Sequence, residues 1–440
     1  MTSPFKRSAF CIQARSGNHP RNRGTPRNPR NPRNRPTRPC DDRHVLFHRA
    51  RLLSLDVFRG ITVAAMLLVN NPGSWGSVYP PLQHAAWHGW TPADLIFPFF
   101  LFIVGVTTHI SIQAARERSA DDERLIERIL ERGAVIFLCG LALNAFPFYW
   151  WGNIAGNPDP TLLERIAWRF DHLRIPGVLQ RIGIVYVVAA LITLKTTTRQ
   201  RAVITAALLL TYWFVMTRIP VPGSGATGLL ALQEGSKTMA GWVDRLIIGE
   251  KHLWSSTKTW DPEGILSTLP AIATALFGVF AGEGITTETK TLPRRILTLY
   301  AFGVLGLVGG ATWGLVFPIN KSLWTSSYAV FTAGFAAVAL ATCMWTIDVL
   351  KWSWWTKPFF LFGVNPLIAF VGSGVMARLL SIIKLDMNGQ PMSLQRVSYE
   401  WFYAPWFIPD IASLLWGLTF VAIWFAILAW LYRRGIILKA

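Results

Sequence analysis

Long apolar runs recur from Leu53 almost to the C-terminus, and they constrain the fold of this chain more than any other feature. A helix of about 20 apolar residues is long enough to cross a bilayer. The runs predict ten spans, at 53–71, 93–114, 133–151, 177–194, 201–218, 264–282, 295–316, 325–349, 358–377 and 411–432. Only 15% of the residues are charged, against roughly 25% in soluble domains. We therefore predict an all-α, polytopic transmembrane helical bundle of about ten spans.

The first 50 residues differ from the rest of the chain. Residues 1–51 hold 13 lysines and arginines, and much of this segment is an Arg-Asn-Pro repeat. Such a composition cannot bury apolar surface, so residues 1–50 are expected to be a disordered basic cytoplasmic tail ahead of a membrane domain at 51–440. The charge would suit nucleic acid or anionic lipid. A solvated tail, or coding sequence upstream of the true start, is the simpler interpretation, and we expect no nucleic-acid partner.

Lysine and arginine counts in the connections predict the orientation of the bundle. With the N-terminus inside, the inner connections hold 16 of these residues even without the tail, and the longer outer connections hold 12. Because cytoplasmic loops are enriched in Lys and Arg, both termini are predicted to be cytoplasmic.

Polar side chains are dense in and beside the first apolar run. Ionisable and amide groups near hydrocarbon are costly, so they usually mark a functional site. The topology places two of them toward the cytoplasm and five at the outer end of the span; the set is Asp56, Arg59, Asn70, Asn71, His84, His88 and Asp94.

His84 is the leading candidate for chemistry, because a neutral imidazole is the usual general base near pH 7. The alternative is an interfacial histidine in an aromatic belt with Trp87 and Trp90. His88 follows four residues later and shares a helical spacing suited to a metal. No third ligand is evident, so we expect no metal site.

Asn70 ends the first apolar run, where its amide can donate to a developing oxyanion or simply cap the helix. Asp94 can cap the second span or orient His84. Asp56 and Arg59 are three residues apart and can pair with each other, or Arg59 can receive a phosphate from the cytoplasmic side.

A second polar group is expected at the outer helix ends. Arg181 lies in an apolar segment, where an arginine is costly without a partner. It either forms a purely structural ion pair or takes part in the site. The outer carboxylates can pair with it or hold a sugar or an ammonium group. We predict substrate contacts from Asp94, Gln180, Arg181, Asp261, Glu263 and Trp324.

Six segments in order resemble the heparan-alpha-glucosaminide N-acetyltransferase family, across roughly residues 51–433. They are SLDVFRGITVAAMLLVNNPGSW, HAAWHGWTPADLIFPFFLFIVG, IPGVLQRIGIVYVV, WDPEGILSTLPAIATALFGVFAG, INKSLWTSSYAVFTAGFA and PFFLFGVNPLIAFVG. The family's active histidine, in an HASW-like motif, matches His84, and its active-site asparagine matches Asn70.

This resemblance implies an acyltransferase domain that moves an acetyl group from cytoplasmic acetyl-CoA to the amine of a glucosamine-type sugar on the outer side. Asp56 and Arg59 would then serve the CoA phosphates. The bacterial relatives imply a multi-pass protein of the bacterial plasma (inner) membrane, and the family implies a possible homodimer. A free amino sugar or small glycan is the expected acceptor, with membrane lipids as the surroundings.

Two other functions stay open at the level of the sequence. One is a sugar transporter or permease, which predicts inverted repeats and interrupted helices near the midplane. The other is an O-acyltransferase that acts on a surface glycan.

Overall fold

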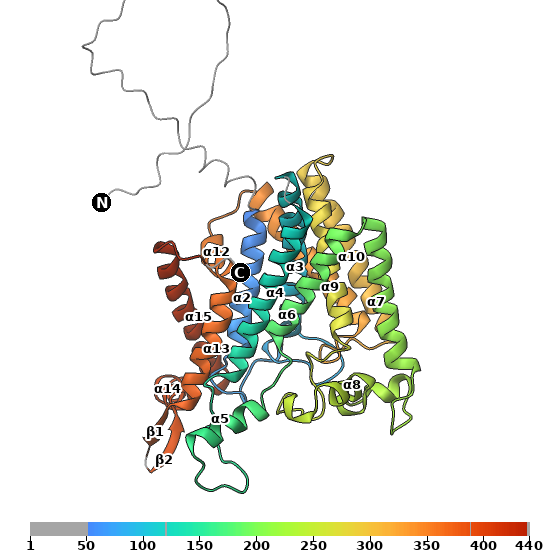
Figure 1. Ribbon diagram of the computed structural model, residues 1–440. Helices are drawn as coiled ribbons and strands as arrows, with labels where there is room; N and C mark the ends of the chain where they lie inside the picture. The colour runs from blue at the N-terminus through green and yellow to red at the C-terminus, as the bar shows by residue number, and fades with distance from the viewer. Residues whose placement is uncertain (1–51, 119–120, 388, 438–440) are drawn as a thin grey trace, which may run out of the picture. The chain divides into compact units, whose positions relative to one another are not determined.

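Helices make up nearly all of the regular secondary structure in this computed structural model, which describes residues 52–118, 121–387 and 389–437 (Figure 1). The basic tail expected at 1–50 lies outside the described residues. Eight described helices are long and apolar enough to cross a membrane, or nine if one bent pair is counted as a span. This arrangement confirms the predicted all-α polytopic membrane protein.

The eight spans follow the apolar runs closely. They are α2 (Leu53–Asn70), α3 (Ile96–Glu117) with its 3-10 lead-in η2 (Pro92–Leu95), α6 (Val178–Lys195), α7 (Thr198–Arg218), α9 (Thr268–Thr286), α10 (Leu292–Trp313), α11 (Ser326–Cys343) with its π-helical extension η6 (Met344–Val349), and α15 (Pro409–Arg433). The close pair α6 and α7 is separated at Thr197, which caps α7 in a reciprocal box with Gln200.

The span expected at 133–151 is too long. It corresponds to the second half of α4 (Asp122–Ala145), which packs along α6. α4 is long enough for a span, but each 18-residue stretch of it holds more than two charged residues. The first half of α4 reads DERLIERILER, and Asp121 caps it by accepting a hydrogen bond from the backbone of Glu123. The helix is therefore charged at the end that follows α3, and it stops at Ala145 before the expected run is complete.

The span expected at 358–377 is two helices rather than one. α12 (Thr356–Val364) and α13 (Pro366–Ile382) meet at an angle of 83°. Proline has no backbone N–H to donate, and it disfavours helical geometry in the residue before it. Asn365 accordingly has φ −125° and ψ 55°, outside the helical region. The break comes directly from the sequence Asn365-Pro366.

α15 runs antiparallel to α2. Near the start of α15, Ser413 exchanges hydrogen bonds with the backbone of Ser74, just beyond the end of α2. Past the end of α15, the carbonyl of Ile436 accepts a hydrogen bond from Asn365. The start of α2 and the end of α15 thus lie toward the same end of the bundle (Figure 1). The prediction that both termini are cytoplasmic requires this arrangement.

The opposite end of the bundle carries the long connections and the short elements (Figure 1). These are η1 (Pro80–Leu82), α5 (Leu162–Asp171), η3 (Gly228–Leu232), η4 (Gly235–Lys237), α8 (Met239–Ile247), η5 (Glu250–His252), α14 (Leu394–Phe402) and a hairpin of β1 (Lys384–Met387) and β2 (Gln390–Ser393). The two strands are antiparallel, with Lys384 opposite Ser393. The lower end of the bundle in Figure 1 is therefore the predicted outer end.

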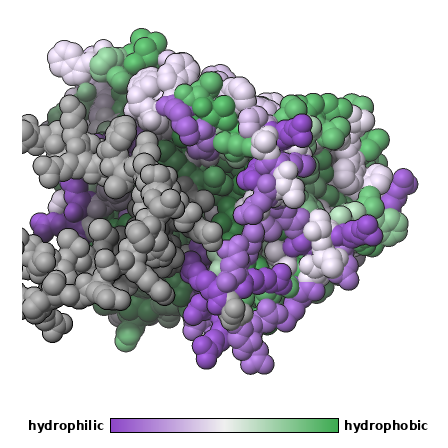
Figure 2. Space-filling view, turned by 90° about the horizontal axis from the view of Figure 1, so that it is seen from above, coloured by the Kyte–Doolittle hydropathy of each residue, from purple (hydrophilic) through white to green (hydrophobic). Residues whose placement is uncertain are grey.

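Burial separates central from peripheral spans. Within the most apolar 18-residue stretch of each helix, 67% of α9 is buried inside the protein, and 61% of α2 and of α11 with its extension. Only 22% of the corresponding stretch of α10 is buried. On α10, Leu297, Val304 and Val308 are all more than half exposed. Their spacing places them along one helical face, which suits contact with lipid tails. Figure 2 views the end from which α2 starts and shows hydrophilic side chains gathered on part of this face, with hydrophobic ones at its margins.

Small residues let α10 pack closely against α11, as their spacing in the sequence indicates. A Cβ added at Gly310 would lie 2.4 Å from the backbone nitrogen of Phe331, and one at Gly306 would lie 2.8 Å from Gly334 Cα. A Cβ added at Gly309 would meet no atom of the described residues within 4 Å, so Gly309 takes no part in this contact.

Candidate active site

A cavity of about 370 Å³ lies where the loops at the outer end meet α2, α3, α6 and α13. Its polar lining near the loops comes from Asn70, His84, Asp94, Arg174, Glu263, Lys321 and Ser322. The lining within the spans is mostly apolar and includes Thr62, Met66, Phe97, Phe100, Ile182 and Phe370. The cavity therefore connects the outer loops with the interior of the bundle.

His84 and Asp94 form the most direct polar contact of this cavity. Nδ1 of His84 lies 2.8 Å from Oδ1 of Asp94, and the side chains are 45% and 1% exposed respectively. Oδ2 of Asp94 accepts hydrogen bonds from the backbone of Ala85 and Thr91, both at 3.0 Å. With Thr91 it also forms a capping box at the start of η2. Asp94 thus caps the second span and orients His84 at the same time.

This contact sets the geometry of the imidazole. When Nδ1–H donates to the carboxylate, the lone pair of the neutral ring is left on Nε2. A base with this lone pair beside a cavity can accept a proton from a bound molecule.

Asn70 and Asn71 have separate roles at the end of α2. Asn71 is the C-cap residue, and its side chain donates to the carbonyl of Leu67 at 2.7 Å. Asn70 is exposed and lines the cavity. In the part of the chain that the structure describes, the Asn70 amide has no hydrogen-bond partner in the protein. The capping alternative therefore applies to Asn71, and the amide of Asn70 is available to a ligand.

Lys321, from the connection between α10 and α11, reaches the same group. Its Nζ lies 3.0 Å from Nδ1 and 3.2 Å from Nε2 of His84, and 3.4 Å from Oδ1 of Asp94. Burial lowers the pKa of Lys321, although the negative charges of Asp94 and Glu263 oppose this shift. One carboxylate, one imidazole and one amine thus meet at the cavity wall.

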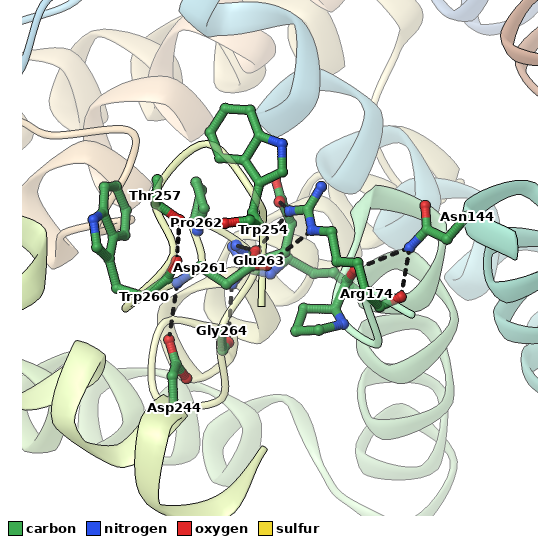
Figure 3. A network of polar contacts seen from close by, with 12 residues as sticks. Asn144, Arg174, Asp244, Trp254, Thr257, Trp260, Asp261, Pro262, Glu263 and Gly264 are labelled. Carbon is green, nitrogen blue, oxygen red and sulfur yellow. Dashed lines mark hydrogen bonds and ion pairs between the residues drawn. The ribbon is translucent and has the colours of Figure 1, made fainter. Parts of the chain in front are cut away.

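A second polar group lies across the loop between α5 and α6 and the loop before α9 (Figure 3). Arg174 holds Asp261 with two hydrogen bonds, Nε to Oδ2 at 2.8 Å and Nη2 to Oδ1 at 2.6 Å, and it reaches Glu263 at 2.5 Å. Its guanidinium lies 5.4 Å from the ring centre of Trp254. Burial alone would lower the pKa of Arg174, but these carboxylates raise it above its usual value. Arg174, Trp254 and Glu263 line the cavity, whereas Asp261 is buried behind them.

Asp244 on α8 fixes the loop that carries those carboxylates (Figure 3). Its side chain accepts hydrogen bonds from the backbone of Ile265 at 2.9 Å and of Asp261 at 3.3 Å. Burial raises the pKa of Asp244 to about 6, and the two hydrogen bonds only partly counter it.

Arg181 and Gln180 lie outside the cavity lining. The fully buried guanidinium of Arg181 donates to the carbonyl of Gly264 at 3.0 Å and to the hydroxyl of Ser267. Of the outer carboxylates expected to pair with Arg181, Asp261 and Glu263 are bound by Arg174 instead. The third, Asp94, contacts His84 and Lys321. Gln180 is 3% exposed and lies between α4 and the loop before α6. Both residues therefore support the cavity from behind rather than from its surface.

Trp324 lines the cavity but is only 1% exposed. Its Nε1 donates to Thr274 at 3.2 Å, and its ring packs edge-on against Phe97. Arg181 lies 5.3 Å from the ring centre. Trp324 consequently forms a rigid part of the wall.

Asp56 and Arg59 lie nearer the other end of α2. Nη2 of Arg59 donates to Oδ1 of Asp56 at 2.7 Å, as their spacing predicts. The cavity lining reaches Thr62 on this helix but includes neither residue of the pair. From Arg59 to Asn70, α2 rises about 16 Å at 1.5 Å per residue.

His88 points to a different neighbour from His84. Its Nδ1 lies 3.3 Å from the side-chain nitrogen of Asn320, and burial lowers its pKa. Among the described residues, no group of three or more His, Cys, Asp or Glu side chains is arranged to hold a metal ion.

Arg174, Trp254 and Lys321 line the cavity but were not among the residues predicted for the site. Arg174 and Trp254 lie in loops whose composition gave no sign of a shared location. Lys321 is the one basic residue of the connection at 314–325, and it lies in INKSLW, a segment that also carries the family resemblance. This single basic residue in an otherwise uncharged connection was the sequence signal that could have indicated a place in the site.

Comparison with known proteins gives a consistent result. The family model described as the catalytic part of heparan-alpha-glucosaminide N-acetyltransferase matches residues 51–312. Heparan-alpha-glucosaminide N-acetyltransferase of Mus musculus is 32% identical over 372 residues, covering 74% of this chain and 54% of the relative. The Homo sapiens protein of the same name is 31% identical over 370 residues, covering 74% and 53%. The chain thus spans about half the length of the curated relatives it matches.

Proposed function

Because this chain belongs to the heparan-alpha-glucosaminide N-acetyltransferase family, we propose that it transfers an acetyl group from cytoplasmic acetyl-CoA to the amine of a glucosamine-type sugar at the outer face of the membrane. The family supports an acyltransferase enzyme in a multi-pass membrane protein. The proposed acetyl transfer from acetyl-CoA to the sugar is supported by one observation. A single cavity is lined by both His84 and Asn70 and extends among the spans.

His84 supplies the base in this proposal. The amine of a glucosamine is mostly an ammonium at neutral pH, and it must lose a proton before it can attack a thioester carbonyl. Nε2 of His84 accepts that proton, while Asp94 holds Nδ1 and stabilises the imidazolium that forms. His84 releases this first proton to solvent. It then takes a second proton from the positively charged nitrogen of the tetrahedral intermediate and gives it to the leaving thiolate of CoA, so the products are the N-acetylated sugar, CoA thiol and one released proton.

Asn70 supplies a donor for the developing oxyanion. As the carbonyl becomes tetrahedral, its oxygen gains negative charge, and a positioned amide stabilises this charge more than the ground state. The amide of Asn70 lies at the cavity wall without a hydrogen-bond partner among the described residues, which suits this role, and α2 holds it in place through the cap at Asn71.

The acceptor sugar is assigned to the outer wall of the cavity. Glu263 provides a carboxylate for hydroxyl or ammonium groups, and Trp254 provides an aromatic surface. Asp261 and Arg181 hold this wall without touching the sugar. A free amino sugar or a small glycan fits an acceptor site of this size better than a long polymer.

The donor is assigned to the cytoplasmic half of the bundle. Thr62 and Met66 extend the lining toward Arg59, whose positive charge suits a phosphate of CoA. Asp56 orients the arginine. The setting we propose is a bacterial plasma membrane, with a homodimer as the assembly that the family implies.

The activity test uses purified protein in detergent, with acetyl-CoA and glucosamine as substrates. We expect N-acetylglucosamine to form, and His84→Ala to lower kcat by about 10²-fold or more. His88→Ala is the matched control, because His88 lies in the same loop but faces Asn320. Full activity of His84→Ala, or equal losses in the two variants, would overturn the assignment of His84.

A further inference from the structure

Lys321 lies beside both ring nitrogens of His84, yet the proposed reaction gives it no role. A lysine ammonium has only donors, so it makes a hydrogen bond to a ring nitrogen only when that nitrogen carries a lone pair. Nζ lies 3.0 Å from Nδ1 and 3.2 Å from Nε2, and because Nδ1–H is directed at Asp94, Nε2 is the nitrogen with a lone pair for the ammonium.

The charges of this group balance when either Lys321 or His84 carries a positive charge, but not when both do. Asp94 is a single buried carboxylate, 1% exposed, and its Oδ1 faces both Lys321 and His84. One carboxylate neutralises one cation. If Lys321 carries that cation, a second positive charge on His84 would stand 3.0 Å from an ammonium, which is strongly unfavourable in a partly desolvated site.

The other charged groups around the cavity leave this balance unchanged. Glu263 lines the same cavity, but Arg174 binds it together with Asp261. His88, from the same loop as His84, faces the side chain of Asn320.

We propose that Lys321 is a positioning residue that keeps His84 neutral, with its lone pair on Nε2 and directed into the cavity. This inference rests on the proposed function, in which a neutral His84 is the base. The acceptor ammonium then replaces the Lys321 ammonium at Nε2, so Lys321 holds the base ready until a substrate cation arrives. Lys321 lies beyond residue 312, where the match to the family model ends.

The test follows His84 directly, without substrates. Histidine labelled with ¹³C and ¹⁵N is introduced into the full chain in nanodiscs, and the His84 signal is identified by its loss in His84→Gln. In Lys321→Gln, we expect His84 to take up its second proton at higher pH than in the wild type, because a neighbouring positive charge has been removed. Lys321→Arg keeps the charge and should leave the titration unchanged, and Lys384→Gln, at an exposed lysine of β1, is the control.

Kinetics give a second measurement. In Lys321→Gln, the acid limb of the kcat/KM profile should move to higher pH by the same amount, because His84 is protonated earlier. Lys321→Met, which keeps the aliphatic stem, should behave in the same way and serves if the glutamine variant does not fold. Unchanged His84 titration in a folded neutral variant overturns the role of Lys321.

The two proposals can fail separately. A shifted titration without any acetyl transfer to glucosamine supports Lys321 and rejects the proposed function. Acetyl transfer with an unshifted titration supports the function and rejects Lys321.

Discussion

Nδ1 of His84 lies 2.8 Å from Oδ1 of Asp94, and the other oxygen of this carboxylate is held by two backbone N–H groups. The acid that orients the histidine is therefore built into the start of the second span, through the capping box of η2. A loop histidine gains a fixed orientation from a rigid helix end.

Replacing Asp94 with asparagine should lower kcat by about 10²–10⁴-fold. The amide keeps the size of the carboxylate, but it can donate to Nδ1 and so favour the tautomer with its proton on Nε2. Steady-state kinetics measure the loss, and thermal unfolding checks that the variant is folded. Near wild-type kcat in a folded Asp94→Asn protein would show that this contact does not orient the base.

The two asparagines at the end of α2 should separate catalysis from stability. Asn70→Ala should lower kcat by about 10²–10³-fold through loss of an oxyanion donor, with little change in stability. Asn71→Ala should lower the free energy of unfolding by about 1 kcal/mol, because it removes the hydrogen bond to Leu67, and should leave kcat nearly unchanged. Steady-state kinetics and chemical denaturation of both variants test this difference. A loss of kcat in Asn71→Ala and a loss of stability in Asn70→Ala would contradict the assignment.

Arg174 should matter mainly for stability. It is the shared partner of Asp261 and Glu263, so Arg174→Ala leaves two carboxylates without their cation. Breaking a buried ion pair in this way costs about 3–5 kcal/mol. Chemical denaturation should show this loss, and a smaller one in Arg174→Lys, which keeps the charge without the two-pronged contact. An alanine variant as stable as the wild type would show that the network is dispensable.

Asp244 should make stability depend on pH. The pKa of its carboxyl in the folded protein is about 6, above the value of about 3.9 for an unfolded chain. The folded state therefore binds more protons between these values, and this residue's contribution to stability falls as pH rises from about 4 to 6. In Asp244→Asn the contribution disappears, so thermal unfolding measured across this range should lose that slope. Asp159→Asn, at an exposed carboxylate, should retain it.

Most of the fold could be predicted from the sequence, because apolar length is a direct requirement of the bilayer. The expected 177–194 and the observed α6 differ by only one residue at each end. The errors occurred where local chemistry interrupts an apolar run. Asn365-Pro366 breaks one span, and α4 ends at Ala145 although apolar residues continue.

The site was harder to predict because its members come from separate loops. His84, Asn70 and Asp94 are close in sequence, so their shared cavity followed from topology and resemblance. The ion pair expected for Arg181 was misplaced, because sequence alone does not show that Arg174 reaches Asp261 first. Lys321 is 237 residues from His84 along the chain, and only the packed structure brings the two together.

Acetyl transfer across a sealed membrane tests the central claim most directly. Protein in liposomes encloses labelled acetyl-CoA, and glucosamine is supplied only outside. The account predicts labelled N-acetylglucosamine in the outer solution, formed by the wild type and not by His84→Ala. Product that forms only when both substrates share one side, or intact glucosamine that enters the vesicles without being acetylated, would contradict it.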